Sequence, residues 1–174
     1  GGVGDYLILR TNKAGTNWFK EVFKPAAQKN IQISASGGSE KGNYFFSGNI
    51  LDYAGIMIGN DYRRYQTRLN SSFNIGKHIR VGENMNIAYQ TKRGSFGNPN
   101  EGSPLIGTYG MPQLVPVYDI RGNFASPANF NSNVSNPVAD QTRNRDNSFG
   151  HSFRVTGSAY GEVDLTDFLT WKTS

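Results

Sequence analysis

The strongest pattern in this sequence is a strict alternation of residue types between Tyr62 and Ile75. One set is polar and consists of Arg64, Gln66, Arg68, Asn70, Ser72 and Asn74. The other set is mostly apolar and consists of Tyr65, Thr67, Leu69, Ser71, Phe73 and Ile75. Because successive side chains of a strand point to opposite faces, this period of two predicts a β-strand with one polar and one apolar face. Such a strand would be roughly 45 Å long at about 3.3 Å per residue, whereas the mean strand has about five or six residues.

Similar segments recur along the chain. The predicted strands cover residues 31–38, 43–52, 62–75, 80–92, 150–164 and 169–174. Their connections alternate between short turns and longer loops, and in an up-and-down meander this places the short turns at one rim and the long loops at the other. The pattern therefore predicts an all-β fold, an antiparallel up-and-down segment of a transmembrane β-barrel. We expect the whole chain, residues 1–174, to be part of one barrel domain with a long external loop over 93–148.

Two segments outside these strands also carry structural signals. Thr16 or Asn17 can cap a short helix that runs to Phe23 and ends before Pro25. Inside the long loop, residues 111–124 are too apolar for a flexible loop surrounded by solvent. We expect this stretch to fold back into the barrel or onto neighbouring loops.

Composition supports the barrel. Only 36% of the residues are hydrophobic although 13% are aromatic, and alternating strands need apolar residues at every second position only. The sequence contains no run of about 18 apolar residues, which excludes a transmembrane helix. The net charge is +5, but the basic residues are scattered along the strands rather than clustered, so we expect no nucleic-acid partner.

The sequence shows no set of residues that would form a metal site, a cofactor site or a catalytic site. With no cysteine, it has neither a disulfide nor a thiolate metal site. His78 and His151 lack a partner at metal-ligand spacing, and the loop carboxylates match no spaced calcium motif (Asp52, Asp61, Asp119 and Asp146). No nucleophile, base and acid can be assembled, so we predict no enzyme, no cofactor and no metal.

Several segments form a recognisable combination: Asn17–Phe23 (Asn-Trp-Phe-Lys-Glu-Val-Phe), Gln32–Tyr44, Asp52–Ile56, Tyr62–Asn70, Pro116–Asn123 and Ala159–Asp164. Together they resemble one family, the SusC/RagA group of TonB-linked outer-membrane transporters. The similarity covers nearly the whole chain from about Thr16, although Asn17 stands where Asp is more usual.

This resemblance implies a barrel of about 22 strands in the bacterial outer membrane. It also implies a plug, import of glycans or oligopeptides driven through the TonB complex, and a SusD-like surface lipoprotein as partner. The plug and the TonB-contact segment are not recognised in this sequence, and six strands cannot close such a barrel. We therefore expect a fragment of a larger protein, corresponding to an early part of the barrel.

If the strands form a barrel wall, their inward residues are candidates for solute contact: Arg64, Arg68, Arg154 and Tyr160. In the long loop, Tyr109 and Tyr118 can stack on sugar rings. The alternatives are a solvated wall or ion pairs with a plug for the first set, and loop packing for the tyrosines. The alternative to a transporter is a soluble β-sheet module that binds carbohydrate or acts in adhesion. In that case the apolar faces would enclose one common core.

Overall fold

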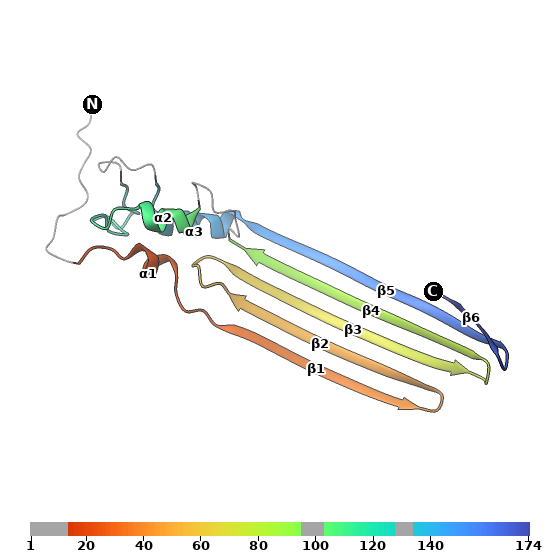
Figure 1. Cartoon of the computed structure of the whole chain (residues 1–174). Coiled ribbons are helices and arrows are strands. Elements are labelled where there is room, and N and C mark those ends of the chain that lie inside the picture. Colours follow the sequence, from red (N-terminus) through yellow and green to blue (C-terminus); the bar gives the residue numbers. More distant parts are fainter. Residues whose placement is uncertain (1–13, 95–102, 128–133) are drawn as a thin grey trace. The chain divides into compact units, whose positions relative to one another are not determined.

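The computed structural model describes residues 14–94, 103–127 and 134–174, and its strands form a single sheet (Figure 1). The strands are β1 Gln28–Ser39, β2 Gly42–Ala54, β3 Asp61–Ile75, β4 Ile79–Arg93, β5 Phe149–Thr166 and β6 Leu169–Thr173. Their order in the sheet follows their order in the chain. This arrangement confirms the predicted all-β fold class, an antiparallel meander of six strands.

The connections between the strands differ in length as the sequence pattern predicts. Residues 40–41, 76–78 and 167–168 form short turns, whereas 55–60 and 94–148 form longer connections. In an antiparallel meander, successive connections lie at opposite ends of the sheet, so all three short turns share one end. The sheet is open: β1 and β6 are its edges in the part of the chain that the structure describes.

The register of the first hairpin shows how residue types divide between the faces. Ile31 lies opposite Ile50, and Ala35 lies opposite Phe46, so the apolar residues of both strands share one face. We call this the apolar face; by alternation it continues through Tyr65, Leu69 and Phe73 on β3, Met85 and Ile87 on β4, and Phe153 and Val155 on β5.

The apolar face is not the lining of an enclosed core. Phe73 is 52% exposed and Val155 is 53% exposed, while Leu69 and Ile87 are half-buried. No second sheet is present among the described residues. A soluble module whose strands surround one common core would bury these four side chains together, and the structure does not.

By its contacts the chain divides into two compact units, one of which contains most of the sheet. The other contains three helices, α1 Trp18–Val22, α2 Pro104–Gly110 and α3 Pro137–Asn147. Its core consists of Trp18, Val22, Met111, Val115, Ala125 and Val138. None of the helices among the described residues is long and apolar enough to cross a bilayer.

Each helix begins at a residue whose side chain accepts a hydrogen bond from the first turn. Asn17 caps α1, Ser103 caps α2 and Asn136 caps α3, and the latter two are followed by proline in the first helical turn. Such a cap satisfies backbone N–H groups that have no partner within the helix. The helix predicted near Asn17 is therefore present, whereas α2 and α3 lie within the stretch predicted as one long loop. The parts of that stretch over 95–102 and 128–133 lie outside the described residues.

Candidate functional site

The second face of the sheet carries a network of polar side chains that joins neighbouring strands. Hydrogen bonds link Asn49 to Asn30 (2.7 Å), Ser72 to Asn43 (2.9 Å), Tyr62 to Gln90 (2.9 Å), Gln66 to Asn86 (2.6 Å) and Asn86 to Thr156 (3.5 Å). These pairs connect β1 through β5 in order. We call this surface the polar face, and it contains the alternating polar residues of β3.

The predicted contact residues Arg64 and Arg68 lie on the polar face of β3, and Arg154 lies on that of β5. The Gln66 carboxamide lies 3.2 Å from Arg68 Nε and 3.3 Å from Arg68 Nη2, and its oxygen accepts from both only in the orientation in which its nitrogen no longer donates to Asn86. Arg64 Nε is enclosed and has no hydrogen-bond partner. Among the described residues, no carboxylate forms an ion pair with any of these three arginines.

Tyr160, the fourth predicted residue on this face, is engaged by its neighbours. Its ring lies 4.7 Å from Lys172 Nζ, an arrangement that attracts the cation to the ring face. Lys172 Nζ also donates to Glu162 at 2.7 Å, and Arg80 Nη1 donates to the same carboxylate at 3.4 Å. We call Tyr160, Glu162, Lys172 and Arg80 the Glu162 cluster; it holds β4, β5 and β6 together.

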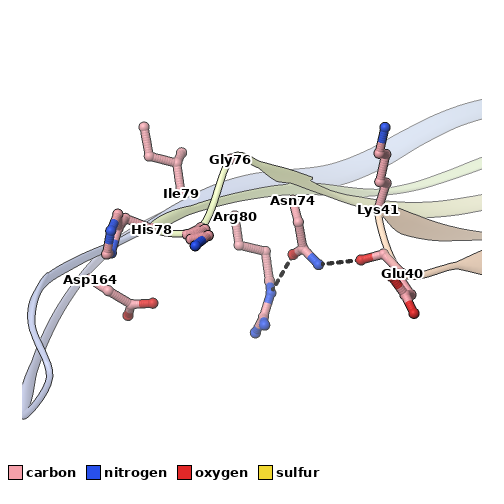
Figure 2. A pocket seen from close by; sticks show the side chains of 9 residues that line it. Glu40, Lys41, Asn74, Gly76, His78, Ile79, Arg80 and Asp164 are labelled. Atoms are coloured by element: carbon pink, nitrogen blue, oxygen red, sulfur yellow. Dashed lines mark hydrogen bonds between the residues drawn. The ribbon is translucent and has the colours of Figure 1, made fainter.

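A cavity of about 550 Å³ lies at the short-turn end of the sheet, and Figure 2 shows the side chains that line it. Asn74 lies at its centre, donating to the Glu40 carbonyl at 3.0 Å and accepting from Arg80 Nε at 3.1 Å. The Asp164 N–H donates to the His78 carbonyl at 2.8 Å. These bonds join the first two hairpins and β5, so the polar lining of this cavity has a structural use.

Tyr109 and Tyr118 lie in the helical unit and not on the sheet. Tyr109 is 77% exposed in α2. Tyr118 is half-exposed and stacks on Phe124, with ring centroids 5.2 Å apart, across a short hairpin. The predicted alternative of packing within the loop therefore describes Tyr118, whereas the ring of Tyr109 projects freely.

Three of the four aspartates considered as calcium ligands serve as local partners, two at strand ends and one in a loop. Asp52 accepts from Arg63 at 3.2 Å, Asp61 lies 3.7 Å from Arg145, and Asp119 accepts from two backbone N–H groups at 2.8 Å. Within 14–94, 103–127 and 134–174, no three His, Cys, Asp or Glu side chains are grouped as metal ligands.

Sequence reasoning did not single out Tyr53 and Tyr62. Their rings lie 6.4 Å apart on neighbouring strands, near the long-loop end of the polar face, and Tyr62 also donates to Gln90. Tyr62 precedes Arg64 by two positions and so has the same parity as the polar row. The alternation of the strand therefore allowed Tyr62 to be assigned to the polar face from the sequence.

The chain is similar to known proteins in both sequence and fold. The chain is 25% identical to TonB-dependent receptor P3 of Formosa agariphila over 166 residues, which are 92% of this chain and 16% of that protein. It is 30% identical to TonB-dependent receptor P39 of the same organism over 158 residues, which are 89% of this chain and 14% of that protein. No family model matches the sequence.

The fold is similar to a part of the RagAB peptide importer. The superposition gives a TM-score of 0.71 for the closed-closed state at 23% identity, covering 95% of this chain and 19% of that one. For the open-open state the TM-score is 0.73 at 24% identity, covering 95% and 18%. These findings confirm the resemblance to TonB-linked outer-membrane transporters and the assignment to the bacterial outer membrane. The chain spans less than a fifth of the length of each of these relatives.

Proposed function

We propose that this chain, a barrel segment similar to TonB-dependent receptors, forms part of the wall of a transporter that imports glycans or oligopeptides. In this proposal a SusD-like surface lipoprotein binds the solute with the barrel, and the TonB complex supplies energy through a part of the protein outside this chain. Membrane lipid contacts the apolar face. The protein has no catalytic role.

One observation carries the proposal: the sheet exposes its apolar face and forms its hydrogen-bonded network on the other. A half-buried sheet of a soluble protein does the reverse, with its apolar face packed and its polar face in water. In an outer-membrane barrel the outward face is apolar because it meets lipid, and the inward face is polar because it meets the lumen. Exposed apolar residues on every strand satisfy the first condition. The side-chain bonds from Asn30 to Thr156 satisfy the second.

The dimensions of the strands agree with this placement. The apolar face of β3 extends from Tyr65 to Ile75, about 33 Å along the strand at 3.3 Å per residue. A strand tilted by about 40° covers roughly 25 Å of membrane thickness over that length, which is the height of the apolar band of such barrels.

The polar face then becomes the wall that faces the solute path. Arg64, Arg68 and Arg154 are candidates for contact with the solute, and the Glu162 cluster that includes Tyr160 stabilises the wall. Tyr109 is a candidate for stacking on a sugar ring because its own ring is exposed. This role does not extend to Tyr118, whose ring is already stacked on Phe124.

The test uses the full-length protein, expressed with its partner lipoprotein in a bacterium that has an outer membrane. We expect the protein in the outer-membrane fraction, and we expect uptake of a labelled oligopeptide or oligosaccharide mixture that stops when the TonB gene is deleted. The matched control is a strain with TonB but without this protein. A protein found in the soluble fraction, or uptake that is unchanged without TonB, would contradict the proposal.

A further inference from the structure

We infer that the polar face selects solutes that carry carboxylate groups, and that Arg64, Arg68 and Arg154 determine this specificity. The inference rests on the proposed function, because it assigns the polar face to the solute path. It goes further by naming the chemistry of the solute.

The first argument is that none of the three arginines forms an ion pair with a carboxylate of the described residues. Arg80 and Lys172, the other cations engaged on this face, share the carboxylate of Glu162 at 3.4 and 2.7 Å. Among the described residues, Arg64, Arg68 and Arg154 have no such partner. Charge on the face is therefore balanced at the short-turn end and positive in the middle. Rings of Arg or Lys give anion selectivity to pores for this reason.

The second argument is the relative position of the arginines. Gln66 on β3 and Thr156 on β5 both bond to Asn86 on β4, so these three residues lie at one level across the sheet. Arg64 precedes Gln66 by two residues and Arg154 precedes Thr156 by two. Because β3 and β5 run in the same direction, Arg64 and Arg154 lie at the same level, about 10 Å apart across two strand spacings.

The residue between these two arginines is uncharged. Ala88 follows Asn86 by two positions on β4 and so lies between Arg64 and Arg154 on the same face. Its methyl group neither neutralises nor bonds a guanidinium. Two cations at this spacing leave room for one anionic group, which each can approach from its own side.

The third argument is that the protein does not use up the hydrogen bonds of these arginines. Arg64 Nε has no hydrogen-bond partner among the described residues. The neutral carboxamide of Gln66 lies 3.2 Å from Arg68 Nε, so the charge of Arg68 is not compensated there. Guanidinium groups bind carboxylate and other oxyanions through two parallel charge-assisted hydrogen bonds.

Aromatic side chains near Arg64 add contact surface for the rest of the solute. Tyr53 and Tyr62 lie on the same face toward the long-loop end, with ring centroids 6.4 Å apart. Flat apolar surfaces of sugars and peptide side chains pack on such rings. The polar face thus combines an aromatic entrance with a basic middle.

The experiment compares uptake by the full-length transporter, with its partner lipoprotein, of four probes. These are an acidic and a neutral oligopeptide of equal length, and a uronate-containing and a neutral oligosaccharide of equal length. The variant Arg64→Gln/Arg68→Gln/Arg154→Gln removes three charges from the polar face. The control variant Lys29→Gln/Lys77→Gln/Arg93→Gln removes the same charge elsewhere: Lys29 and Arg93 have the parity of the apolar face, and Lys77 lies in a short turn.

We expect uptake of one of the two acidic probes to fall at least about tenfold in the first variant. The reason is that this variant lacks three groups that can form charge-assisted hydrogen bonds with the probe. Uptake of the neutral probes should change by less than about twofold, and the melting temperature should change by less than a few degrees. The control variant should behave like the wild type. The acidic probe that responds identifies peptide or glycan as the source of the anionic group.

Three outcomes would overturn the inference. One is unchanged uptake of both acidic probes, and another is an equal loss for acidic and neutral probes. The third is a large loss of stability, which would show that the arginines pair with another segment of the protein. Each of these leaves the proposed function intact as long as the wild type imports any probe with TonB. If the wild type imports none, the proposed function fails instead.

Discussion

The ring of Tyr160 on β5 lies directly across Gly82 on β4. A Cβ atom added at Gly82 would lie 2.5 Å from two carbons of the ring. The pair Tyr44 and Gly37 repeats this relationship on the first hairpin, where the two residues are opposite each other in the register and the contact would be 2.8 Å. Glycine in a strand interior usually weakens a sheet, and here an aromatic side chain covers the surface that glycine leaves bare.

Substitution of Gly82 should therefore destabilise the protein through a clash. We expect Gly82→Ala to lower the free energy of unfolding by roughly 1–3 kcal/mol, because the methyl group forces the Tyr160 ring out of its position. The measurement is urea unfolding of the full-length protein in lipid vesicles. Gly48→Ala is the control, since no heavy atom lies within 4 Å of the Cβ position at Gly48.

The same experiment contains an internal check. In a Tyr160→Ala background the space over Gly82 is empty, so Gly82→Ala should then have little further effect. Equal destabilisation by Gly82→Ala with and without the tyrosine would refute the proposed packing.

Glu162 should determine how firmly the edge strand β6 is held. It accepts from Lys172 on β6 and from Arg80 on β4, so Glu162→Gln leaves two cations facing a neutral amide. We expect faster amide hydrogen exchange in β6 and at the adjoining end of β5, with β1 and β2 unchanged. Lys77→Gln removes a charge from the same end of the protein and serves as the control. If both variants exchange alike in β6, the cluster does not stabilise this edge.

The strands could be predicted from the sequence because their signal is local. Alternation at Arg64, Tyr65, Gln66 and the following positions reflects the two faces of one strand, and no knowledge of its neighbours is needed. The polar row of β3 also identified Arg64 and Arg68 as residues of a single face. Whether a carboxylate of the described residues pairs with them depends on β4, β5 and β6, and so required the structure.

Packing across strands could not be predicted from the sequence, because its signal is not local. Tyr160 covers Gly82, which is distant in sequence, and that pairing depends on the register between β4 and β5. A shift of one residue would move Tyr160 to the other face. Helices α2 and α3 are a different case. Ser103-Pro104 and Asn136-Pro137 are recognisable helix starts, but the polar and proline-rich composition around them favoured a loop.

Asn136 should be essential to the helical unit. Its side-chain oxygen accepts from the N–H groups of Val138 and Ala139, and its nitrogen donates to the carbonyls of Val117 and Ala125 at 2.9 and 3.0 Å. One buried carboxamide thus caps α3 and joins it to the hairpin that carries Tyr118. We expect Asn136→Ala to destabilise this unit by roughly 2–3 kcal/mol, the combined cost of the lost cap and of the lost bonds to the two carbonyls, of which that of Val117 still accepts from the Ala125 N–H.

Amide hydrogen exchange in the helical unit of the full-length protein, whose core includes the buried Trp18, reports its unfolding. Asn147→Ala, at the exposed end of α3, is the control and should unfold like the parent. An Asn136→Ala protein with parental stability would show that the four bonds of this carboxamide are dispensable.

Glu83 gives the sharpest test of which face meets lipid. Its side chain lies on the apolar face of β4, and its carboxylate accepts from Ser71 Oγ at 3.2 Å. Charged residues on the lipid-facing side of a barrel are unfavourable to an extent that depends on depth. We therefore expect Glu83→Leu to stabilise the full-length protein in vesicles by roughly 1 kcal/mol. The neighbouring substitution Asn84→Leu, on the polar face, should bring no gain, because in the proposed barrel that side chain meets water. Since Ser71 has lost its partner in the Glu83→Leu protein, Ser71→Ala should be neutral there and unfavourable in the wild type. If Asn84→Leu stabilises the protein and Glu83→Leu does not, the two faces of the sheet have been assigned the wrong way round, and the polar face cannot be the solute path.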